Sequence, residues 1–210
     1  MLERSSQHAH TGSKKMSTTS TALMTAEELM ELPDDDLRHE LINGELITMP
    51  LPKLPHGRST TRLGLPLAQF VLENELGEVY ISDIGFQLTR NPDTVVAPDI
   101  SFISKKRLEQ AGDVEGYWQG PPDLAVEVYS PGYRPGKVSE RISRLFSFGT
   151  KQVWIVHLKH STVAVYRSVS DITTFSGSDY LEAQDLFPGF RLSLERIFGP
   201  TPGIVKESTR

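Results

Sequence analysis

Two acidic residues stand among apolar residues in segments whose composition is typical of buried β-strands. Asp99 lies in "VVAPDISFI" and Glu127 lies in "PDLAVEVYSP". An ionised carboxylate in a dry strand costs several kcal/mol unless a cation or a hydrogen-bond network compensates it. If the two strands are neighbours, the two charges approach each other and need a divalent cation or a shared proton. We therefore expect Asp99 and Glu127 to hold Mg²⁺ or Mn²⁺; a hydrogen-bonded pair of structural carboxylates is the alternative.

The strand that carries Glu127 belongs to a larger predicted unit. Strand alternation in "DLAVEVYS" places Glu127 on one face with Ala125 and Tyr129, and the three aliphatic residues on the other face. Residues 119–158 have the pattern strand, helix, strand, and the helix is expected to end at Gly149. The length of this connection is typical of a parallel crossover. The predicted class is α/β (α+β), with one mixed sheet.

The first half of the chain predicts further helices and strands. Thr25 and Glu28 have the spacing of a capping box, which starts a short helix. Asn43 and Gly44 separate two alternating runs, which indicates a tight hairpin. Helical spacing then runs over residues 56–75. The segments "EVYISDIGFQLT", "TVVAPDISFI" and "PDLAVEVYS" are rich in β-branched and aromatic residues and predict three or four strands at the centre of the sheet.

Composition limits the class of protein. The 210 residues suffice for one domain, which we expect over residues 23–199, with a disordered tail over 1–22 and a flexible tail over 200–210. The chain has no cysteine, so a metal would be held by carboxylates, histidine or carbonyls. The net charge of −5 argues against binding a polyanion through bulk charge. No apolar run has the length of a membrane span, and we expect a cytoplasmic protein with no membrane partner.

Four segments, in this order, resemble one known family. They are "RHELINGELITM", "VVAPDISFI", "PPDLAVEVYSP" and the helix leading into "FGTKQVWIV". Over roughly residues 24–199 they are similar to the Uma-two family of restriction endonucleases, a branch of the PD-(D/E)xK nuclease superfamily. The resemblance implies a restriction-endonuclease-like fold, with a central mixed β-sheet flanked by helices. It also implies an acidic metal site and metal-dependent hydrolysis of DNA phosphodiesters.

The resemblance implies roles for individual residues. Asp99 matches the aspartate of the family's PD element, and Glu127 matches the acidic residue of the second half-motif, so both would hold Mg²⁺ or Mn²⁺. The superfamily's lysine would stand two residues after Glu127, where this chain has Tyr129. In the Uma-two family the basic role moves to the following helix, and the matching position is Arg141. Arginine can clamp a phosphate, but its pKa above about 12 makes it a poor proton acceptor. Lys137 stands where the family commonly has an acidic residue.

Four more positions are candidates for the site. Glu40 and Glu45 flank the predicted hairpin turn and match acidic positions of the family; Glu40 could add a catalytic carboxylate, and a solvated strand glutamate is the alternative. His56 matches a family histidine and begins a helix, where an imidazole could meet a phosphate; a structural cap is the alternative. Arg141 and Arg144 form a basic group expected to contact DNA, with a solvated helix face as the alternative.

Three functions follow from these observations. The main hypothesis is an endonuclease that hydrolyses DNA with Mg²⁺. A homodimer is a reasonable extension of it, because many nucleases of this fold cut two strands in that form. The principal alternative is a protein that keeps the fold, has weak or no cleavage activity, and binds nucleic acid or protein; Arg141, Lys137 and the acidic net charge favour it. The third is an unrelated enzyme that uses a carboxylate-bound metal on another phosphoester.

Overall fold

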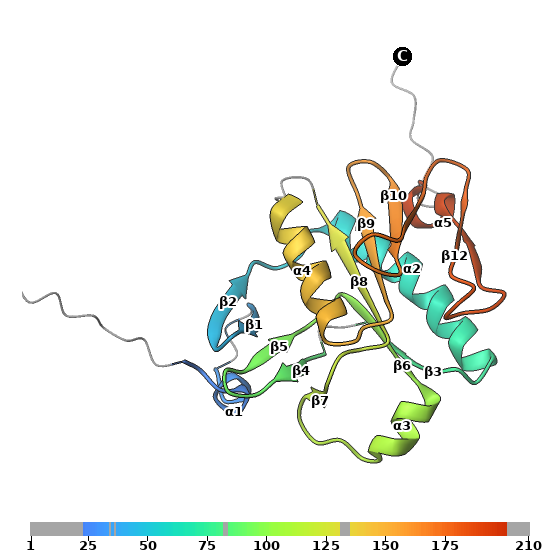
Figure 1. Cartoon of the computed structure of the whole chain (residues 1–210). Coiled ribbons are helices and arrows are strands. Elements are labelled where there is room, and N and C mark those ends of the chain that lie inside the picture. The colour runs from blue at the N-terminus through green and yellow to red at the C-terminus, as the bar shows by residue number, and fades with distance from the viewer. Residues whose placement is uncertain (1–22, 34, 36, 82–83, 131–134, 201–210) are drawn as a thin grey trace, which may run out of the picture.

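The computed structural model describes residues 23–33, 35, 37–81, 84–130 and 135–200. The two predicted tails lie outside the described residues, apart from residue 200. The described part of the chain contains both helices and strands (Figure 1). In chain order they are α1 (Ala26–Met30), β1 (Arg38–Ile42), β2 (Glu45–Met49), α2 (Leu54–Glu73), β3 (Gly77–Tyr80), β4 (Phe86–Thr89), β5 (Thr94–Val96), β6 (Ile100–Ser104), α3 (Lys105–Ala111), β7 (Trp118–Gln119), β8 (Leu124–Tyr129), α4 (Pro135–Ser147), β9 (Gln152–His157), β10 (Thr162–Tyr166), β11 (Ile172–Phe175), β12 (Tyr180–Glu182), β13 (Arg191–Ser193) and α5 (Leu194–Phe198).

A six-stranded mixed sheet forms the centre of the molecule, in the order β11-β10-β9-β8-β6-β3. Helices α2 and α4 pack on its two faces (Figure 1). Leu67 of α2 belongs to one apolar core with Val126, whereas Ile142 of α4 belongs to the other with Ala125 and Ile155. The two faces of β8 therefore divide as strand alternation predicts, and Glu127 lies on the α4 side.

The predicted parallel crossover is confirmed. β8 and β9 pair in parallel, with Glu127 opposite Ile155, and α4 connects them. The helix ends at Ser147, and Gly149 follows with φ of +101°, a value that glycine tolerates better than other residues. The side chains of α4 are therefore fixed beside the carboxyl half of β8.

The described residues form three sheets, where the sequence predicts one. The second sheet has the order β2-β1-β5-β4-β7, and β12 pairs with β13 in the third. "VVAPDISFI" divides between two sheets, since β5 ends at Val96 and β6 begins at Ile100. Pro98 has no amide hydrogen to donate to a strand ladder, so the chain leaves one sheet and enters the next around it. The central segments thus hold five strands rather than three or four.

The local signals near the amino end also form the expected structure. Thr25 caps α1: its hydroxyl accepts a hydrogen bond from the Glu28 amide at 3.2 Å, and its own amide donates to the Glu28 carboxylate at 2.8 Å. Asn43 and Gly44 form the hairpin turn with φ of 52° and 77°. Helix α2 begins at Leu54, two residues earlier than predicted, because a proline fits the first turn of a helix.

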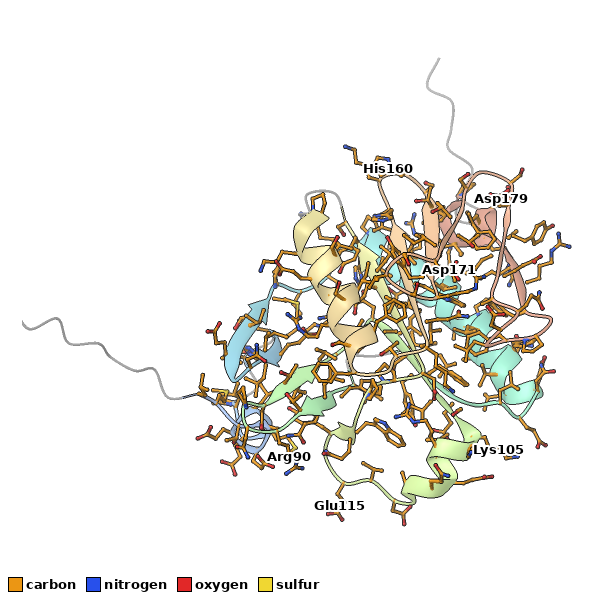
Figure 2. The ribbon with its side chains drawn as sticks, viewed as in Figure 1. Arg90, Lys105, Glu115, His160, Asp171 and Asp179 are labelled. Atoms are coloured by element: carbon orange, nitrogen blue, oxygen red, sulfur yellow. The ribbon has the colours of Figure 1, made fainter. Side chains whose placement is uncertain are left out.

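Charged side chains are mostly exposed. The six residues labelled in Figure 2 are all exposed. Over the part of the chain that the structure describes, none of the helices has the length and apolar character needed to cross a bilayer. Three of the buried charged residues, Glu40, Asp99 and Glu127, gather where the five-stranded sheet meets β8 and α4.

Candidate active site

Asp99 and Glu127 are brought together by the pairing of β6 with β8. Ile100 lies opposite Val126 in this antiparallel pair, so the same register places Asp99 opposite Glu127. The Asp99 carboxylate accepts a hydrogen bond from the backbone amide of Val128 at 2.7 Å. Asp99 is 6% exposed and Glu127 is 5% exposed. The two carboxylates are thus buried neighbours, as the sequence predicts.

Arg141 supplies the compensating charge from α4. Its Nε donates to Glu127 Oε1 at 2.6 Å, while Nη1 and Nη2 donate to the two carboxylate oxygens of Glu40 at 2.6 and 2.8 Å. Such two-pronged pairs between arginine and a carboxylate combine charge with fixed geometry. Lys137, one turn earlier, lies on the surface and pairs with Glu140 at 3.0 Å. Lys137 therefore makes no contact with this cluster of buried charges.

Glu40 reaches the cluster from β1, and Arg38 comes with it. The Glu40 Oε1 atom accepts a hydrogen bond from the Ala97 amide at 2.8 Å. Arg38 donates to Asp99 Oδ1 at 2.8 Å and also hydrogen-bonds to the Ala97 carbonyl. Sequence analysis missed Arg38. The spacing of Arg38 and Glu40 could have indicated it, because residues two positions apart on a strand share a face and Glu40 was already a candidate.

His56 joins the cluster from the first turns of α2. Its Nε2 atom lies 3.2 Å from Asp99 Oδ2, and its Nδ1 atom lies 3.4 Å from the Thr60 hydroxyl. The Thr60 hydroxyl also donates to the His56 carbonyl at 3.0 Å. The imidazole is therefore oriented towards a carboxylate of the site.

Two candidates lie apart from this hydrogen-bonded cluster. Glu45 is exposed on β2. Arg144 is half-buried one turn after Arg141, and within the described residues its guanidinium forms no hydrogen bond or ion pair. Burial, and then the charge of Arg141, lower the pKa of Arg144, while Glu40 acts in the opposite direction. Arg144 thus lies near the cluster, but its guanidinium donates no hydrogen bond to the residues of the cluster.

A comparison of the whole sequence shows which family the chain belongs to. The family model Uma2, described as "Putative restriction endonuclease", matches residues 26–195. The chain belongs to the Uma2 family. No curated protein matches this Uma2 chain.

A solved structure has the same fold as this Uma2 chain. It comes from Anabaena variabilis ATCC 29413 and is described as "a putative nuclease belonging to DUF820". The TM-score is 0.71 at 23% sequence identity, and the match covers 83% of this chain and 97% of the other. At that identity the likeness establishes the fold alone, and it agrees with the restriction-endonuclease-like fold predicted from the sequence.

Charge in the Uma2 site is not balanced by the two arginines. Three carboxylates (Glu40, Asp99 and Glu127) face Arg38 and Arg141. Burial, together with the negative charge of Asp99, raises the pKa of Glu127 to about 7, although Arg141 opposes the shift. Burial also acts on Glu40 and Asp99, but the pKa of Glu40 is lowered by Arg141, and that of Asp99 by His56 and Arg38. Glu127 is therefore the carboxylate of the three whose ionised form is disfavoured.

The chemistry of these side chains fits Mg²⁺. Magnesium in phosphate-processing sites is commonly held by one or two carboxylates, with substrate oxygens and waters as the other ligands. Among the described residues no group of three or more histidine or acidic side chains is arranged to hold a metal ion. A site of two carboxylates does not require one. Asp99 and Glu127 would hold the ion, and its positive charge would favour the ionised form of Glu127.

The raised pKa of Glu127 predicts a pH dependence of stability. The folded-state pKa of about 7 exceeds the ordinary value of 4.5. The protonated carboxyl therefore contributes stability that is complete below about pH 4.5 and is lost as the pH rises through about 7. A shift of this size corresponds to about 3 kcal/mol. Glu127→Gln has no such group, so its advantage over wild type should grow by about 2.5 kcal/mol between pH 5 and pH 8.

Urea unfolding of wild type and Glu127→Gln in EDTA, at both pH values, measures this difference. Glu40 and Asp99 titrate in both proteins and largely cancel in the comparison. A difference in free energy of unfolding that stays the same at the two pH values would contradict the assignment of a raised pKa to Glu127.

Proposed function

We propose that this Uma2 chain is an endonuclease that hydrolyses phosphodiester bonds in DNA with Mg²⁺, or with Mn²⁺ in its place. The observation that carries the proposal is the buried pair of Asp99 and Glu127, two neighbouring carboxylates that a divalent cation would hold in the ionised form. Membership of a family described as restriction endonucleases supports the same function. DNA would be the substrate.

The residues of the cluster have separate parts in this proposal. Asp99 and Glu127 would hold the ion, and Glu40 fixes Arg141 from the opposite side. When bound, the metal ion would lower the pKa of a bound water and offset charge on the phosphate. Arg141 would stabilise the charge that grows on the phosphate, and its pKa, raised by the two carboxylates despite burial, excludes it as a base.

Two further residues would contact the substrate. Arg144 has unused donors close to Arg141, so a DNA phosphate would be a suitable partner for its guanidinium. His56 would orient Asp99 through the contact at 3.2 Å and could approach a phosphate from the beginning of α2.

Cleavage of supercoiled plasmid tests the proposal. The purified chain is incubated with plasmid in Mg²⁺, in Mn²⁺ and in EDTA, and the products are separated on a gel. We expect nicked or linear DNA with either metal and intact DNA in EDTA. Intact plasmid under all three conditions, from protein whose circular dichroism shows it to be folded, would contradict the nuclease proposal.

One observation favours a second candidate function, that of a binding module with weak or no cleavage. Arg141 directs Nε and both Nη atoms towards carboxylates, and Tyr129 stands where the superfamily has its lysine. A phosphate would have to compete with Glu40 and Glu127 for the guanidinium. A binding module would retain affinity for labelled DNA in EDTA while leaving plasmid intact in Mg²⁺.

A further inference from the structure

The outer face of α2 carries a row of exposed leucines. Leu54, Leu65 and Leu72 are 75%, 59% and 66% exposed. At 3.6 residues per turn, spacings of about 11 and about 7 residues place all three on one side of the helix. The opposite side packs into the core through Leu63 and Leu67, which are fully buried. Helix α2 thus presents three leucines to solvent on one side, which also carries Arg58 and Thr61.

Charge is distributed unevenly along the same helix. Lys53 and Arg58 stand at its beginning, whereas Glu73 is its last residue; Glu75, just beyond the helix, is paired with Lys105 at 3.0 Å. Glu73 also accepts a hydrogen bond from Gln69 at 2.8 Å, an uncharged partner that leaves its negative charge in place. One half of α2 is therefore basic and the other half is acidic.

A helix with these properties is complementary to an antiparallel copy of itself. If the twofold axis crosses the outer side of α2 level with residue 63, Leu54 of one chain faces Leu72 of the other. In the same register Lys53 faces Glu73, and Thr61 faces Leu65. Lys53 meets Glu73 at both ends, and between them Leu54 meets Leu72 and Leu65 meets Thr61. A parallel pairing would instead bring like charges together at each end.

We propose that two copies of this chain associate through α2, antiparallel and in this register. An interface of this kind is isologous, because the same surface of both chains takes part. A hollow of about 540 Å³ lies between α2 and α5, lined in part by Leu65, Pro66 and Arg196, and it gives a side chain of the second copy room to insert. The association does not depend on the proposed hydrolysis.

Engineered cysteines test the register directly, because the natural chain has no cysteine. In Leu54→Cys/Leu72→Cys, the two positions within one chain are about 27 Å apart along the helix, too far for a disulfide. Between chains they face each other. We expect the double variant to form a disulfide-linked dimer on mild oxidation, whereas Leu54→Cys and Leu72→Cys alone stay unlinked. Absence of the linked dimer from the double variant would overturn the register.

Light scattering after gel filtration tests the interface itself. We expect the wild type at high micromolar concentration to have about twice the chain mass of 23.4 kDa. Leu65→Lys should halve the measured mass. Ile172→Lys is the matched control, since it changes a residue that is 46% exposed on β11 and should leave the mass unchanged. A monomeric wild type, or a dimer that survives Leu65→Lys, would overturn the proposal.

Discussion

Arg141→Met is expected to lower the free energy of unfolding by about 3–5 kcal/mol, the cost of leaving buried charges without a partner. Methionine fills a similar volume, but it removes the donors that bind Glu40 at 2.6 and 2.8 Å and Glu127 at 2.6 Å. Both glutamates are nearly inaccessible to solvent, so water cannot replace the lost contacts.

Urea unfolding at neutral pH measures this loss. Lys137→Met is the matched control on the same helix, because Lys137 is exposed and its pair with Glu140 is of the kind that contributes less than about 1 kcal/mol. Arg141→Lys should lie between the two, since an ammonium keeps the charge but lacks the planar fork that spans two carboxylates. A loss below about 1 kcal/mol in Arg141→Met would show that the cluster relaxes without its arginine.

Glu127→Gln is expected to abolish cleavage and to leave the thermal midpoint unchanged or raised. The amide keeps the shape of the side chain and can still accept the hydrogen bond from Arg141, but it removes the negative charge that would bind Mg²⁺. The same substitution relieves the repulsion from Asp99 that contributes to the raised pKa of Glu127. Activity and stability should therefore change in different directions.

Plasmid cleavage in Mg²⁺ measures the activity, and a thermal melt of the same preparation measures the stability. Glu45→Gln serves as the control, because Glu45 is an exposed glutamate outside the cluster; it should cleave like wild type. Loss of cleavage accompanied by a large fall in the thermal midpoint would instead support the alternative in which Asp99 and Glu127 form a structural pair.

The parts of the fold that local patterns control could be predicted from the sequence. Strand alternation placed Glu127 on the correct face of β8, and the connection length gave the parallel pairing of β8 with β9. The capping residues of α1 and the turn at Asn43 and Gly44 could also be predicted from the sequence. Each of these features depends on residues only a few positions apart, or on a periodicity that persists through an element.

The separation into three sheets and the composition of the ion cluster could not be predicted in this way. Pro98 was visible, but whether the strand after it rejoins the same sheet depends on packing that no local pattern records. Arg141 and Glu40 are 101 positions apart, and no local pattern in either segment indicates that the two side chains will meet. Arg38 was missed for a related reason, since its alternation with Glu40 matters only once Asp99 is known to lie beside them.

The clamp made by Arg141 also joins separate parts of the architecture. Glu40 belongs to the five-stranded sheet and Glu127 to the six-stranded sheet, so one guanidinium on α4 links both. Separating the sheets would break charged hydrogen bonds in a buried place, where they are most costly to lose. The two sheets are thereby coupled into a single cooperative folding unit, in which the amides of β1 and β8 would exchange with solvent through shared opening events.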